Sequence, residues 1–305
     1  MLTDLNVPWP AVPNKISLAN LSKTLDILRD LGYTAVALNY TIDGTSKNPL
    51  AATAGGSANV KHNVTDVVCQ IDLSMLPAPI PAGLRVLRRV TLVIDDSSNS
   101  HQPQRLTALG TVYDIVAVRP KSERTLLMAC TALDGVDIIS LDMTVRFPCV
   151  LRHRTIGAAV GKGIKFEIAY AGGKDPSLSL AAGNNNNKEK KIKLTSASAE
   201  AVNHLEDGSG LSGMANPESR RQLISNAAHL LRSSRGRGLL IVSEAYSPVV
   251  VRGPYDVINV ASIWGVDHMR ARHALERVPE AVIKAGYLRR SSYKQVIAAS
   301  VPPSA

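Results

Sequence analysis

The chain has little cysteine and no long apolar run. Its three cysteines, Cys69, Cys130 and Cys149, are odd in number and never spaced as CxxC. This argues against a disulfide framework and a cysteine zinc site, and fits a reducing compartment such as the cytosol or nucleus. No apolar run reaches the roughly 18 residues of a membrane span, so we expect no membrane partner. Asp4 stands where a signal peptide carries basic residues, so we expect no secretory leader.

Aromatic residues are also scarce, at 4% of the 305 residues. Recognition of single-stranded nucleic acid by base stacking is therefore poorly supported. Positive charge is in excess, because 35 Lys and Arg face 25 Asp and Glu and leave a net charge of +10 at pH 7. This balance favours a polyanionic partner, with RNA or DNA ahead of a membrane surface.

Signatures of catalysis within the chain are missing too. There is no GxSxG sequence, and His268 and His273 lie five residues apart, so they do not share the helix face that HExxH zinc binding needs. The segment 157–163 resembles a phosphate loop, but it has one residue too few between its glycines and leads into a predicted strand. Asp95 and Asp96 follow a predicted strand and suit a divalent metal, although a turn or helix cap explains them as well. We expect no catalytic residue and no metal site.

Short apolar runs alternate with helical stretches along most of the chain. We predict strands at 2–7, 35–39, 90–94, 115–118, 138–141, 164–168 and 239–242, with a helix at 122–133 between the fourth and fifth. Strands this apolar, separated by helices, are typical of a parallel sheet covered on both faces. The predicted fold class is therefore α/β, an irregular TIM-barrel-like fold of about seven parallel strands with surrounding helices. An open doubly wound sheet is the alternative.

We predict a single domain over 1–305 with low-complexity insertions at 43–83 and 171–216. The first holds only a weak strand candidate at 64–73, and the second holds an asparagine run and a lysine cluster at 188–193. Such polar tracts cannot offset their ordering entropy by burial, so we expect disordered insertions. The lysine cluster fits a nuclear localisation signal, but a solvated charge run is the favoured explanation.

Cations gather at the amino ends of three predicted strands, the third, the sixth and the seventh. The segment 231–238, LRSSRGRG, joins an amphipathic helix to the seventh strand and fixes guanidinium groups beside the core. Such groups bind phosphates or carboxylates in bidentate fashion and position RNA without reading its sequence. The alternative is a helix end whose carbonyls attract arginine. The candidate RNA- or partner-binding residues are Arg88, Arg89, Lys162, Lys165, Arg232, Arg235 and Arg237.

Several blocks of the chain resemble one family. They are MLTDLNVPW at 1–9, YDIVAVRP at 113–120, RFP at 146–148 with GIKFEIAY at 163–170, and RSSRGRG at 232–238. In this order they resemble the 30-kDa protein subunit of eukaryotic ribonuclease P and ribonuclease MRP. The likeness covers most of the chain outside the two insertions. Gly236 departs from it, because the family has serine or a similar residue between the last two arginines.

The resemblance implies a barrel subunit that is not itself the catalyst. In the family's complex, the RNA cleaves precursor tRNA at its 5′ end with magnesium ions. The protein binds no cofactor and scaffolds the RNA, a small ferredoxin-like protein subunit and other subunits. Implied roles are tRNA and rRNA processing, and the implied location is the nucleus, including the nucleolus.

Two other functions are left open. The barrel is distantly similar to metal-dependent phosphoesterases of the polymerase-and-histidinol-phosphatase type, whose first strand carries Asp-Leu-His-x-His-type ligands. Here that place reads DLNVP at 4–8, which lacks both histidines, so such a metal site is hard to build. The other alternative is a protein-interaction module without RNA contacts.

Overall fold

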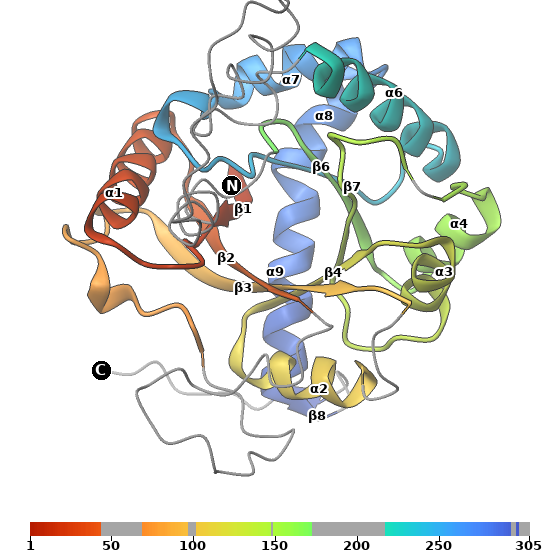
Figure 1. Ribbon diagram of the computed structural model, residues 1–305, viewed down its shortest axis with the longest axis horizontal. Coiled ribbons are helices and arrows are strands. Elements are labelled where there is room, and N and C mark those ends of the chain that lie inside the picture. Colours follow the sequence, from red (N-terminus) through yellow and green to blue (C-terminus); the bar gives the residue numbers. More distant parts are fainter. Residues whose placement is uncertain (44–68, 97–101, 148, 173–216, 294–296, 299–305) are drawn as a thin grey trace, which may run out of the picture.

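A computed structural model describes residues 1–43, 69–96, 102–147, 149–172, 217–293 and 297–298. Seven parallel strands form one sheet in chain order, and Figure 1 shows them as a ring with helices outside. They are β1 Thr3–Pro8, β2 Ala35–Asp43, β3 Arg85–Ile94, β4 Ile115–Pro120, β5 Ile138–Ser140, β6 Lys165–Ala169 and β7 Leu239–Val242. The predicted irregular α/β barrel is thereby confirmed.

Helices follow the strands and pack around the ring. They are α1 Lys15–Asp30, α2 Gln102–Val112, α3 Glu123–Thr131, α4 His153–Gly161, α6 Pro217–Ser234, α7 Pro254–Ile263, α8 His268–Leu275 and α9 Arg277–Ser291, with short helices η1 Leu73–Met75 and η4 Pro248–Val250. β8 Ser292–Tyr293 and β9 Ile297–Ala298 form a separate antiparallel pair. α1 shows the local logic: Asn14 caps it by accepting from the Ser17 amide at 2.7 Å, and its leucines at helical spacing are buried.

The ring closes between β1 and β7 without a regular ladder in the described residues. Instead, the Glu244 amide donates to the Asn6 carbonyl at 2.8 Å, and the Ser243 amide donates to Asp4 Oδ1 at 3.1 Å. The register of β1 shifts between Asp4 and Val7, which is where these contacts are made. The seam is therefore held by residues just beyond β7 and by one buried carboxylate.

α9 covers the amino ends of β4 and β5. Val282 packs into the apolar interior of the barrel, and a Cβ added at Gly286 would lie 2.1 Å from the Asp114 carbonyl oxygen. Arg289 pairs with Asp137 at 2.6 Å, and Arg290 pairs with Asp114 at 2.5 Å. In Figure 1 this helix lies behind the ring and crosses it. The amino ends of the strands are thus not one open basic face.

The predicted bounds of the third strand need correction, and the predicted insertions are only partly tested. β3 begins at Arg85 instead of Val90, so Arg88 and Arg89 lie within the strand and not before it. Part of the first predicted insertion packs on the barrel, because Ile71 is buried there. Residues 44–68 and 173–216, with the lysine cluster at 188–193, lie outside the described residues, and the single-domain division stays a prediction. Within the described part of the chain, no helix is long and apolar enough to cross a membrane.

Candidate nucleic-acid interface

The turn between α6 and β7 is tight and left-handed. We call residues 232–238 the arginine turn. Arg235, Gly236 and Gly238 have φ values of 54°, 70° and 65°. The Gly236 amide donates to the Leu231 carbonyl at 3.1 Å, and the Arg237 amide donates to the Ser234 carbonyl at 3.2 Å. Backbone amides therefore cap the end of α6, so the arginine side chains are not needed to cap it.

Two glycines hold the arginine turn against neighbouring helices. A Cβ at Gly236 would lie 2.7 Å from Nη1 of Arg270 on α8, and one at Gly238 would lie 3.1 Å from Cγ2 of Val160 on α4. A side chain at 236 would thus displace Arg270 as well as strain the backbone. The geometry of this turn therefore favours glycine at position 236.

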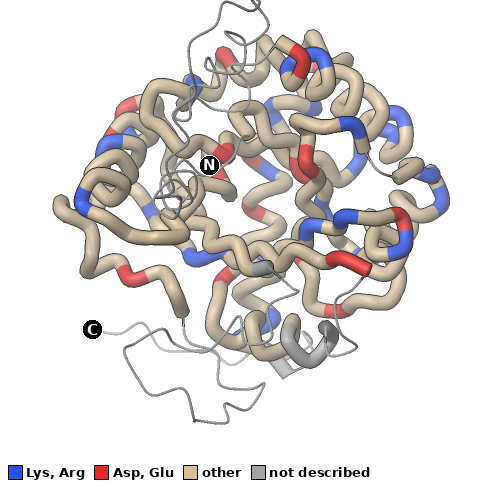
Figure 2. The backbone as a smooth tube through the Cα atoms, in the orientation of Figure 1, with Lys and Arg blue, Asp and Glu red and all other residues tan. Residues whose placement is uncertain are grey.

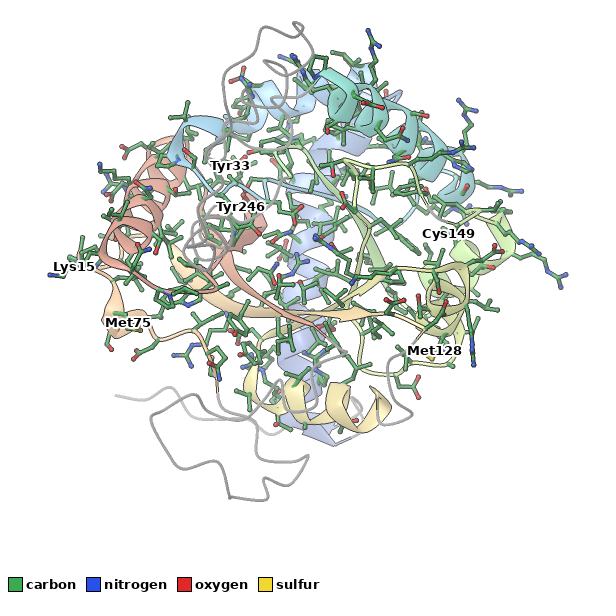
Figure 3. The ribbon with its side chains drawn as sticks, in the orientation of Figure 1. Lys15, Tyr33, Met75, Met128, Cys149 and Tyr246 are labelled. Atoms are coloured by element: carbon green, nitrogen blue, oxygen red, sulfur yellow. The ribbon has the colours of Figure 1, made fainter. Side chains whose placement is uncertain are left out.

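The three arginines of the turn point to solvent. Arg232, Arg235 and Arg237 are exposed, and within the described residues none forms an ion pair. Lys162, at the end of α4, is also exposed, but its Nζ donates to the Thr131 carbonyl and lies 3.8 Å from Asp134. Figure 2 shows Lys and Arg recurring along α3, α4 and α6, and Figure 3 shows nitrogen-tipped side chains projecting outward there. The arginine turn therefore presents three exposed cations together, without an ion pair among the described residues.

A hollow of about 390 Å³ lies between α4 and the arginine turn. We call it the α4 hollow; it is lined by His153, Gly157, Val160, Gly161, Ser234, Arg235 and Arg237. His153 Nδ1 lies 2.7 Å from the Ser233 carbonyl oxygen. Because a carbonyl only accepts, Nδ1 carries the hydrogen of that bond, and the ring is held in one orientation. The segment 157–163, which does not match a phosphate loop, forms the end of α4 and the residues just after it.

Three predicted site residues lie apart from this surface. Arg88 is exposed on the outer side of β3. Lys165 is half-buried on the inner face of β6, beside Ile138, and burial lowers its pKa. Arg89 is wholly buried in the barrel, with its side chain 0% exposed, so its prediction as an RNA- or partner-binding residue was wrong. Its position in an apolar strand, with the inner-face residue Leu87 two places before it, carried a signal of inward direction.

Arg89 belongs to a buried polar cluster near the carboxyl ends of the strands. Its Nη1 and Nη2 donate to the two carboxylate oxygens of Glu167 at 2.6 and 2.9 Å, and Nη1 also donates to the Leu5 carbonyl at 2.9 Å. Asn6 donates to Glu167 at 3.3 Å and accepts from Asn39 at 2.8 Å. Burial raises the pKa of Glu167, but Arg89, with smaller contributions from Ser140 and Arg119, holds that pKa below its ordinary value.

A second pair lies beside this cluster. Arg119 of β4 donates to Glu244 at 2.6 Å and to Ser140 at 2.9 Å. Burial raises the pKa of Glu244, and Arg119 only partly offsets it. We call the whole assembly, to which every barrel strand or its following turn contributes, the polar ring. Its members are Asn6, Asn39, Arg89, Thr91, Arg119, Ser140, Glu167 and Glu244.

The polar ring brings together residues that the sequence alone does not connect. Glu167 and Ser140 carry no signal of these contacts in the sequence, because their partners lie far away in the chain. Asp96, a candidate metal ligand, accepts from Ser122 Oγ at 2.7 Å at the start of α3. Within the described residues, no group of three or more His, Cys, Asp or Glu is arranged to hold a metal.

Fold and surface together define an α/β-barrel protein in which the interior arginines Arg89 and Arg119 are paired with carboxylates and the arginines of the arginine turn face outward. The chain matches the family described as RNase P subunit p30 over residues 1–291, and it belongs to that family. It is therefore a ribonuclease P/MRP protein subunit, as the sequence predicted.

Relatives agree with this assignment. The chain is 30% identical to the probable ribonuclease P protein subunit 3 of Schizosaccharomyces pombe, covering 97% of this chain and 98% of the relative. It is also 30% identical to the ribonuclease P/MRP protein subunit RPP1 of Saccharomyces cerevisiae, covering 97% and 84%. The mouse ribonuclease P protein subunit p30 is 25% identical, covering 86% and 79%.

A solved structure shares the fold. It is a chain from archaeal ribonuclease P with mature tRNA, 12% identical, with a TM-score of 0.54 over 99% of this chain and 100% of that one. The metal-dependent phosphoesterase alternative gains no support from these comparisons. In addition, Asn6, which stands where those enzymes carry a ligand histidine, is engaged in the polar ring.

Proposed function

We propose that this chain is a non-catalytic subunit that binds the RNA of ribonuclease P and ribonuclease MRP through the arginine turn. The observation that carries the proposal is the set of three exposed arginines, Arg232, Arg235 and Arg237, without ion pairs among the described residues. A guanidinium group binds a phosphate through two parallel hydrogen bonds, and it does so without reading the base.

The backbone of the arginine turn favours binding because it is already ordered. Its amides bond back into α6, and Gly238 packs on α4 directly before β7 begins. A fixed backbone loses less conformational freedom on binding than a mobile tail. Arginines on such a turn are suited to hold a folded RNA in one position, as a scaffold requires.

The same proposal assigns the chemistry to the RNA. The buried carboxylates Glu167 and Glu244 are each paired with a guanidinium, so neither is free to act on a substrate in the barrel. In this proposal magnesium acts with the RNA, the complex matures the 5′ end of precursor tRNA and processes rRNA, and the chain binds no cofactor. The family resemblance supports a small ferredoxin-like protein subunit as a further partner, and the nucleus and nucleolus as the location.

The dependence of RNA binding on salt tests the proposal. The three arginines are changed to alanine together, and the affinity for transcribed ribonuclease P RNA is measured between low and moderate salt. Each lost phosphate contact should make the slope of log affinity against log salt shallower, by about 2 to 3 in total. The matched control changes three exposed cations elsewhere, Lys15, Lys23 and Arg85; Figure 3 places Lys15 on the side opposite Cys149, near α4.

Two results would contradict the proposal. One is an unchanged slope together with a large loss of thermal stability, which would make the three arginines structural. The other is hydrolysis of a phosphoester by the purified chain with added manganese and no RNA, which would make the chain an enzyme in its own right.

A further inference from the structure

Two of the α4 residues that line the α4 hollow, Gly157 and Gly161, carry no side chain. They lie one helical turn apart on the face of α4 that lines the hollow, and a Cβ added at either would meet nothing within 4 Å. Glycine within a helix is less stable than alanine because the unfolded chain has more freedom to lose. No packing contact among the described residues requires glycine at these two positions. What the two glycines provide is open space.

The opposite wall of the hollow shows a second departure from local stability. Arg235 lines it with a φ of 54°, a left-handed conformation that a non-glycine residue adopts only at a cost. Glycine fits this backbone better and stands at the next position, Gly236. Arginine at 235 therefore has a backbone cost that glycine would not have, and what it adds to the hollow is a guanidinium group. Both departures, the two bare glycines and the strained arginine, face the same space.

The charge of the hollow is uniformly positive or neutral. Arg235 and Arg237 line one wall, His153 stands at the start of α4, and no carboxylate lines the hollow. Its volume of about 390 Å³ falls in the range of small-ligand sites, about 300–1,000 Å³. The hydrogen bond from His153 Nδ1 to the Ser233 carbonyl ties α4 to the end of α6 across the hollow, so its two walls are fixed.

We propose that the α4 hollow seats one phosphodiester of an RNA backbone. Arg235 and Arg237 bind its non-bridging oxygens, and the adjoining sugars lie along the bare edge formed by Gly157 and Gly161. This inference rests on the proposed function and sharpens it, from a basic surface to one position on it. A backbone phosphate fits better than a protein carboxylate because it carries bulky groups on both sides, which need the open glycine edge.

Substitutions that stabilise the free protein test this seat. Gly157→Ala and Gly161→Ala fill the open space beside α4, and Arg235→Gly relieves the backbone while removing the cation. We expect each to leave the melting temperature of the full chain equal or higher. Each should weaken binding to transcribed ribonuclease P RNA about tenfold, the loss of one charge-assisted contact. Arg235→Gly should also make the salt slope shallower by about one unit. Ala158→Ser is the control, because it adds one atom to α4 at an exposed position outside the hollow lining.

The outcomes separate the seat from the proposed function. If Arg235→Gly weakens RNA binding while both alanine variants bind as tightly as the parent chain, the arginine turn binds RNA but the hollow is no seat. If no variant weakens RNA binding but the alanine variants weaken the capture of a protein subunit, the hollow contacts that subunit and the seat is refuted, while the triple alanine variant still decides the proposed function. Loss of RNA binding in the alanine variants and not in Ala158→Ser supports the seat. Phosphorothioate interference at one RNA position, absent with Gly161→Ala, supports it further.

Discussion

Replacing Arg89 by methionine should be one of the most damaging single changes in this chain. The Arg89 side chain is wholly buried, and its guanidinium meets both oxygens of Glu167, at 2.6 and 2.9 Å. It also serves the Leu5 carbonyl at 2.9 Å and Thr91 Oγ1 at 3.3 Å, while its Nε has no hydrogen-bond partner. Methionine fills a similar volume but donates nothing.

The loss of folding stability can be worked out from the groups that lose a partner, Glu167 and the Leu5 carbonyl. Breaking a buried ion pair by removing one partner typically costs about 3–5 kcal/mol, because the remaining charge is buried without compensation. The Leu5 carbonyl also loses a donor, which adds about 1–3 kcal/mol if nothing replaces it. A loss of about 4 kcal/mol or more is comparable with a large share of the stability of an ordinary domain.

Removing both charges should cost far less. In the double variant Arg89→Met/Glu167→Leu no charge is stranded, and a buried pair replaced by apolar residues is often neutral. The sum of the two single losses should therefore exceed the loss of the double variant by several kcal/mol, with Asn6 left to lose one partner.

The pH dependence of the unfolding free energy gives an independent test of the Arg89–Glu167 pair. In the parent chain Arg89 holds the pKa of Glu167 below its ordinary value, so the pair contributes stability above that ordinary value and loses it as pH falls through the folded pKa. In Arg89→Met, burial is opposed only by Ser140 and the more distant Arg119, so the pKa of Glu167 rises relative to that in the parent chain. The variant's deficit should then be largest near neutral pH and shrink as pH falls.

Urea unfolding of the four proteins between pH 4.5 and 7.5 measures all three effects. A loss under about 1 kcal/mol for Arg89→Met, or a deficit that grows toward low pH, would refute the reasoning. The salt slope of RNA binding should match the parent chain, because a wholly buried guanidinium neutralises no phosphate.

Three further changes test other parts of the fold. Asp4 is buried at the seam with its pKa raised to about 6 by burial, so the parent chain should lose stability as pH rises from about 4 through about 6. Asp4→Asn keeps the acceptor for Ser243 and should flatten that dependence, with a gain of up to about 3 kcal/mol at pH 7; parallel curves of unfolding free energy against pH would contradict this. Gly286→Ala should cost about 1–3 kcal/mol, because its Cβ would strike the Asp114 carbonyl and lift α9 off the barrel. Gly157→Ala, which meets open space, should gain up to about 1 kcal/mol, so equal melting temperatures for these two glycine variants would be evidence against the packing described.

The sequence predicts the barrel well because buried parallel strands are apolar on both faces. β7 is an example: its four residues, Leu239–Val242, are all buried and match the predicted bounds. β3 shows the limit. Its first half contains Arg85, Arg88 and Arg89, and such a stretch reads as a loop until a partner is known. That partner, Glu167, lies 78 residues further along the chain, and only the closed ring of strands brings the two together.

The arginine turn was predictable because its signals are local. Glycine and arginine lie within a few residues of a helix end, and turn chemistry needs no distant partner. The place of α9 was not predictable in this way. The sequence pattern of α9 indicates a helix. Its position at the amino ends of β4 and β5 depends on the close packing of Gly286 against the Asp114 carbonyl and on the ion pair between Arg289 and Asp137.

Pairing within the fold is what separates the structural cations from the binding ones. Arg89, Arg119, Arg289 and Arg290 each contact a fixed carboxylate, so their charge is neutralised inside the molecule or at the amino end of the barrel. Sequence alone groups these residues with the arginines of the turn, because all contribute equally to the net charge of +10. Only cations without such a partner release counterions from RNA. The salt dependence of binding should therefore follow the exposed, unpaired arginines beside the α4 hollow, and not the total number of basic residues in the chain.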